Sequence, residues 1–102
     1  MAASKKEERA SERFELRLAV NVALGERRFT TETANVSLGG AFLLTEEKPP
    51  LGTKLALQIS LPSQKELVQV GATVRWVDTN GIGVQFDGLR ARDVWALGKL
   101  LP

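Results

Sequence analysis

The sequence contains neither cysteine nor histidine among its 102 residues. Without cysteine, the chain can form neither a disulfide nor a thiolate metal site. Without either residue type, Ser-His and Cys-His nucleophile pairs are excluded, and so are nearly all transition-metal sites. The carboxylate pairs Glu7-Glu8 and Glu46-Glu47 lie in polar stretches and give no convincing acid–base pair. We therefore expect a protein that is not an enzyme and that carries no cofactor.

Strong charge of one sign and long apolar runs are also missing. The net charge is +2, which is too small for the basic stripe of a protein that binds nucleic-acid backbones. No apolar run approaches the ~20 residues that cross a bilayer. The amino end, MAASKKEERASER, has no apolar segment of the kind found in secretory signals. We expect a cytoplasmic protein that neither binds nucleic acid nor inserts into a membrane.

The residues that are present alternate with the period of β-strands. Residues 1–12 are small and charged, which predicts a flexible N-terminal arm because they cannot bury enough apolar surface to become ordered. From Leu16 to Val22, every second residue is apolar, as in a half-buried strand. Five further runs read as strands, at 28–36, 40–45, 54–61, 66–77 and 82–86.

The carboxyl end has a different period. In residues 89–102, Val94, Leu97 and Leu101 recur at helical spacing. The expected fold is all-β with a C-terminal helix: six antiparallel strands close into a small barrel, which removes exposed strand edges, and the helix covers one mouth. The barrel domain then spans residues 13–102.

Two tryptophans have competing interpretations. Trp76 shares a face with Val74 and Ala72 in the alternating pattern, which favours packing in the core over stacking on a base. Trp95 lies off the main apolar stripe of the helix. It could anchor a partner protein, but we expect it to cover the open end of the barrel.

Three arginines, Arg9, Arg13 and Arg17, are spaced four residues apart before the first strand. One interpretation is a helix face supported by Glu–Arg pairs. Strand alternation begins at Leu16, however, so Arg17 lies at the beginning of the expected strand and Arg13 lies on the segment before it. A guanidinium fork matches phosphate oxygens and also the O6 and N7 acceptors of guanine.

The stretch NVSLGG interrupts the alternation between the second and third expected strands. Asn35 carries both a hydrogen-bond donor and an acceptor, and Ser37 carries a hydroxyl. Gly40 lets backbone approach a ligand closely. Taken alone, this stretch is an ordinary loop, and Arg-x-x-x-Arg occurs by chance in many chains.

Together, the two motifs resemble the signatures of the PilZ domain family. RFELR matches Arg-x-x-x-Arg, and NVSLGG matches Asp/Asn-x-Ser-x-x-Gly about twenty residues later. The stretches VGATVRWV and GIGVQF look like the closing strands of that family. The likeness covers about residues 9 to 101.

The resemblance implies a six-stranded antiparallel Greek-key β-barrel that binds cyclic di-GMP, a bacterial second messenger. By position, Arg13 and Arg17 would hold phosphates and the Hoogsteen edge of guanine. Asn35, Ser37 and Gly40 would line the guanine site.

Arg9 forms an alternative pair with Arg13, or it assists as an additional cation. We prefer Arg13 with Arg17, because the second arginine of the family precedes the apolar pattern of the strand directly.

The resemblance further implies a receptor or adaptor that changes conformation when cyclic di-GMP binds and signals through a downstream protein partner or as a homodimer. Motility, biofilm formation and surface polysaccharide are the processes that the family suggests. One alternative is a PilZ-like protein-interaction module that acts independently of nucleotide. Another is a small barrel that binds single-stranded nucleic acid, although such barrels usually present several aromatic platforms in a basic groove.

Overall fold

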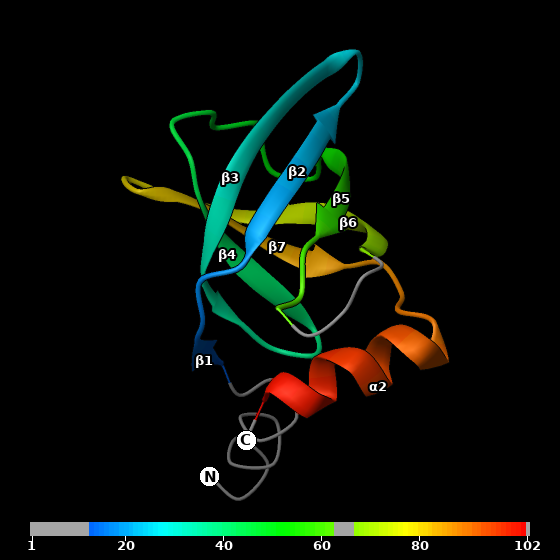
Figure 1. Ribbon diagram of the computed structural model, residues 1–102. Helices are drawn as coiled ribbons and strands as arrows, with labels where there is room; N and C mark the ends of the chain where they lie inside the picture. Colours follow the sequence, from blue (N-terminus) through cyan, green and yellow to red (C-terminus); the bar gives the residue numbers. More distant parts are fainter. Residues whose placement is uncertain (1–12, 63–66, 102) are drawn as a thin grey trace, which may run out of the picture.

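The computed structural model describes residues 13–62 and 67–101. The predicted flexible arm, and Arg9 within it, lie outside the described residues. The elements, labelled in Figure 1, are strands β1 (Phe14–Glu15), β2 (Ala19–Leu24), β3 (Arg27–Val36), β4 (Gly40–Leu44), β5 (Lys54–Ile59), β6 (Val68–Asp78) and β7 (Gly81–Phe86), and helix α2 (Ala91–Leu100).

The strands form one antiparallel sheet that closes on itself. Its order is β1-β3-β2-β5-β6-β7-β4, and β3 also pairs with β4. Strands β2 to β7 therefore make a closed ring of six, while the short strand β1 pairs with the end of β3 as its third neighbour. Because β4 and β5 are not neighbours, the chain between them crosses from one part of the ring to another, as in a Greek key. The six-stranded barrel with a C-terminal helix is confirmed.

Alternating apolar residues fill the barrel, as the period-two pattern predicts. On β5 and the first part of β6, every second side chain points inward and is buried. The core contains these residues together with their counterparts on the other strands, and the largest fully buried apolar side chains are Leu43, Leu57, Ile59, Ile82, Leu97, Val20, Val22, Val36, Val74 and Val84.

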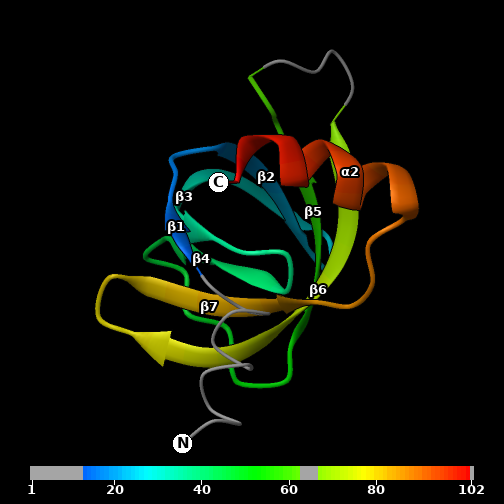
Figure 2. The same ribbon diagram turned by 90° about the horizontal axis from the view of Figure 1, so that it is seen from below.

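Helix α2 lies across one end of the barrel (Figure 2), where Leu97 is completely buried. Ala96 and Leu100 pack beside it against the core. The expected position of Trp95 over the open end is wrong, because Trp95 is 62% exposed and Leu97 closes the barrel instead. Val94, which the apolar stripe placed with Leu97, is also exposed.

Asp93 explains why the inward face of α2 differs from the predicted stripe. Its side chain is buried one turn before Leu97, and its carboxylate accepts a hydrogen bond of 3.0 Å from Nε of Arg90. This ion pair offsets part of the cost of burying a charge. The carboxylate also lies in the first turn of the helix, where the helix dipole favours negative charge.

Within the described residues, no helix is long and apolar enough to cross a membrane. The same residues contain no cluster of three or more acidic side chains suited to hold a metal ion.

We predict that Leu97→Ala lowers the free energy of unfolding by about 2–5 kcal/mol, because it opens a cavity where the helix meets the barrel. Val94→Ala, on the exposed face of the same helix, should change it by no more than about 0.5 kcal/mol. Urea denaturation of both variants measures the difference. Equal effects would show that α2 does not pack as described.

Candidate functional site

A β-bulge in β3 turns Asn35 to the outer surface of the barrel. Thr33 pairs with Leu43 and Asn35 pairs with Phe42, so Ala34 is an extra residue on β3. An extra residue exchanges the two faces of a strand beyond it. Thr33 therefore points into the barrel and is fully buried, whereas Asn35 faces outward.

A second bulge, in β6, does the same for Trp76. Val74 pairs with Val84 and Trp76 pairs with Gly83, so Arg75 is the extra residue. The prediction that Trp76 packs in the core with Val74 is wrong, because that prediction assumed unbroken alternation. Trp76 is instead 37% exposed, on the outside of the barrel.

The two bulges lie at the same level of the barrel. Asn35 pairs with Phe42, Phe42 pairs with Gly83, and Gly83 pairs with Trp76. These four residues form a continuous row on the outer surface across β3, β4, β7 and β6, which we call the outer row. The rings of Phe42 and Trp76 are stacked, with centroids 6.3 Å apart and planes inclined by 24°.

Gly83 allows this arrangement. A Cβ atom at position 83 would overlap the indole ring of Trp76. Because glycine has no side chain, the ring of Trp76 can pack directly against the β7 backbone and stack on Phe42. The sequence pattern GIGV, with glycine at outward positions of a strand, is the signal that could have revealed an aromatic platform here.

Arg13 joins the two ends of the outer row. Its Nη1 donates a 3.0 Å hydrogen bond to Oδ1 of Asn35. Its guanidinium carbon also lies 4.6 Å from the ring centroid of Trp76, a cation–π contact. Partial burial lowers the pKa of Arg13 from its ordinary value, but a guanidinium remains protonated at neutral pH. The site therefore presents a fixed positive charge over an aromatic surface.

Arg17 lies between β1 and β2, and its side chain contacts Glu32 on β3. Its Nη1 is 3.3 Å from Oε1 of Glu32, and both side chains are more than half exposed, at 65% and 57%. An exposed pair of this kind contributes only about 0–1 kcal/mol. Glu32 thus holds Arg17 only weakly.

Ser37 and Gly40 build the turn beside Asn35. The Ser37 hydroxyl accepts hydrogen bonds of 3.1 Å from the backbone N–H groups of Gly39 and Gly40. Ser37 is 1% exposed. A Cβ atom at Gly40 would overlap the carbonyl oxygen of Val84 on β7, so glycine is needed for β4 and β7 to pair there. The described structure gives both residues a role inside the turn, and contact of either with a ligand stays a prediction.

Of the residues expected at the site, the structure brings Arg13 and Asn35 into contact and places the Arg17 side chain against Glu32, three residues before Asn35 on β3. Sequence reasoning missed Phe42 and Glu32. It considered Trp76 but assigned it to the core.

One groove of about 380 Å³ lies elsewhere, over β2, β3, β5 and β6, and its lining includes Asn21, Ala23, Thr30 and Ala56. It contains none of the signature residues. We therefore place the candidate site on the open surface around the outer row.

A family model describes residues 7–101 as a PilZ domain. The chain belongs to the PilZ domain family. Among curated proteins, none matches this sequence.

Solved structures share the PilZ fold. The Bacillus subtilis inhibitor of motility MotI/DgrA superposes with a TM-score of 0.73 at 23% identity, covering 86% of this chain and 46% of that one. The PilZ domain of CeSA from a cellulose-synthesizing bacterium gives 0.69 at 18%, covering 89% and 95%. The Borreliella burgdorferi PlzA protein, solved in complex with c-di-GMP, gives 0.65 at 11%, covering 96% and 37%. The chain thus spans less than half of MotI/DgrA and PlzA.

We predict that Gly83→Ala pushes the indole of Trp76 away from β7 in this PilZ domain. The overpacking should lower the free energy of unfolding by about 1–3 kcal/mol. In a Trp95→Phe background, Trp76 is the only tryptophan, so its fluorescence emission should shift to longer wavelength as the ring enters water. Gly98→Ala is the control, because open space surrounds Gly98 on the helix. Unchanged emission in Gly83→Ala would contradict the described position of the ring.

Proposed function

We propose that this PilZ domain is a receptor that binds cyclic di-GMP on the outer row and the neighbouring arginines. The observation that carries the proposal is the contact of Arg13 with both Asn35 and Trp76. It joins a residue of each family signature to an aromatic surface that neither signature contains.

The chemistry of this surface fits a guanine nucleotide. An aromatic side chain offers a stacking face that contributes about 1–3 kcal/mol per base in nucleic-acid complexes. Asn35 offers both a donor and an acceptor to a base edge, and a guanidinium can bind either the phosphate or the O6 and N7 atoms of guanine. In the proposed complex, the base stacks on the platform of Trp76 and Phe42.

Both arginines have weak partners that a ligand can replace. Arg17 exchanges Glu32 for a phosphate oxygen, and Arg13 exchanges the neutral Asn35 for the ligand. A phosphate accepts charge-assisted and often bidentate bonds from a guanidinium, whereas Asn35 is a neutral acceptor and the exposed Arg17–Glu32 pair contributes only about 0–1 kcal/mol. Binding would therefore move the two arginine side chains of residues 13–18, the arginine segment, into a new arrangement against the barrel.

The proposed output is a change in the surface that this segment presents. A ligand shifts a conformational equilibrium only by its difference in affinity for the two states, and the exchanged contacts of the arginines supply that difference. The signal then passes to a downstream protein partner or through self-association as a homodimer. Because cyclic di-GMP is a bacterial second messenger, the proposal places this non-enzymatic receptor in the cytoplasm.

Isothermal titration with cyclic di-GMP tests the proposal. We expect the wild-type protein to bind with micromolar or tighter affinity and Arg17→Ala to bind about tenfold to hundredfold more weakly, since one charged hydrogen-bonding group is lost.

Arg27→Ala is the matched control. Arg27 is also exposed, at 68%, and also forms an ion pair on β3, with Glu47. It should keep wild-type affinity because it lies at the opposite end of β3. Equal losses in the two variants would indicate general electrostatic attraction. No heat from the wild-type protein would favour the nucleotide-independent interaction module.

A further inference from the structure

The ladder between β3 and the amino-terminal strands is interrupted beside the arginine segment. Glu15 pairs with Asn35, and the next pair is Ala19 with Glu32. Three residues, 16–18, therefore face only two residues of β3, at positions 33 and 34. The regular backbone hydrogen bonds of a sheet cannot continue across such a gap, so other partners have to satisfy its backbone groups.

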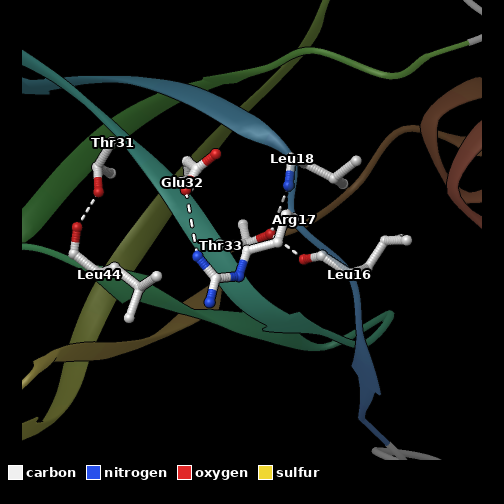
Figure 3. Close-up of polar contacts among 7 residues, drawn as sticks. All are labelled: Leu16, Arg17, Leu18, Thr31, Glu32, Thr33 and Leu44. Carbon is white, nitrogen blue, oxygen red and sulfur yellow. Dashed lines mark hydrogen bonds and ion pairs between the residues drawn. The ribbon is translucent and has the colours of Figure 1, made fainter.

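The side chain of Thr33 supplies these partners (Figure 3). Its hydroxyl donates a hydrogen bond to the carbonyl oxygen of Leu16 and accepts one of 2.9 Å from the N–H of Leu18. The backbone N–H of Thr33 also donates to the carbonyl oxygen of Leu18 at 3.0 Å. Thr33 is fully buried, so water does not compete for these bonds.

These bonds hold the backbone on both sides of Arg17. The carbonyl before it and the N–H after it meet at the same hydroxyl group. Leu18 is buried, and Leu16 packs against the core. The side chain between them points outward, to where Figure 3 shows Arg17 meeting Glu32.

We propose that Thr33 is a positioning residue for the anion-binding arginine: its hydroxyl fixes the backbone around Arg17 before the ligand arrives. This inference rests on the proposed function, in which Arg17 binds a phosphate of cyclic di-GMP. A long exposed side chain loses entropy when it is immobilised, and a backbone that is already fixed reduces the total cost of binding. Without the hydroxyl, the Leu16 carbonyl and the Leu18 N–H lose their partner, and the segment relaxes away from β3.

Thr33→Val tests the inference because valine has nearly the shape of threonine but no hydroxyl. We expect its affinity for cyclic di-GMP to fall about tenfold.

The control is Thr31→Val. Thr31 lies two residues earlier on β3, and its hydroxyl donates to the carbonyl oxygen of Leu44 on β4, away from the arginine segment (Figure 3). Thr31→Val loses one part-buried hydrogen bond where Thr33→Val loses two, so its stability should fall less, and its affinity should stay within about twofold of wild type. Thr33→Ser, which keeps the hydroxyl, should restore binding. Equal affinities of Thr33→Val and Thr31→Val would overturn the inference.

Amide hydrogen exchange gives a readout that needs no ligand. In Thr33→Val, the N–H of Leu18 should exchange about tenfold or more faster than in Thr31→Val, while amides in the centre of β5 keep the same relative protection in both. Unchanged exchange at Leu18 would also overturn the inference. If the wild-type protein fails to bind cyclic di-GMP but Leu18 responds as expected, the proposed function is wrong. The hydrogen bonds by which Thr33 holds the backbone around Arg17 are then still supported.

Discussion

The candidate site depends on two extra residues, Ala34 in β3 and Arg75 in β6. A strand in a closed barrel buries every second side chain, and one inserted residue exchanges the buried and exposed positions that follow it. The insertion in β3 faces β4, and the insertion in β6 faces β7. Since β4 and β7 are neighbours, Asn35 and Trp76 turn outward at the same level. The outer row, and the surface that Arg13 contacts, follow from these two bulges.

The same irregularity shapes the arginine segment. β3 gains a residue against β4, but on its other edge it has fewer residues than the segment that faces it. Thr33 lies at the meeting point of both mismatches, with its backbone paired to Leu43 and its hydroxyl bonded to the segment. A single buried hydroxyl group thereby links the bulge that exposes Asn35 with the backbone that presents Arg17. This explains how residues distant in the sequence can act on one ligand.

Much of the fold could be predicted from the sequence, because alternation depends on burial and burial dominates the choice of strands. The six strands and the helix follow from that pattern. The faces of Trp76 and Trp95 could not be predicted. Alternation assigned Trp76 to the core, and only the pairing of Trp76 with Gly83 reveals the bulge. For Trp95, the apolar stripe could not show that a charged residue, Asp93, is buried on the inward face of the helix, where Arg90 pairs with it. The signature residues were found through resemblance, whereas Phe42 and Glu32 belong to no motif and become visible only through their contacts.

The most direct test of the central claim is the response of the two indole N–H signals in a ¹H–¹⁵N NMR spectrum to cyclic di-GMP. If the bulge in β6 places Trp76 in the binding surface, its signal should move on titration together with the side-chain amide of Asn35. The signal of Trp95, exposed on the helix, should stay in place. Movement of the Trp95 signal with a stationary Trp76 signal would contradict the account.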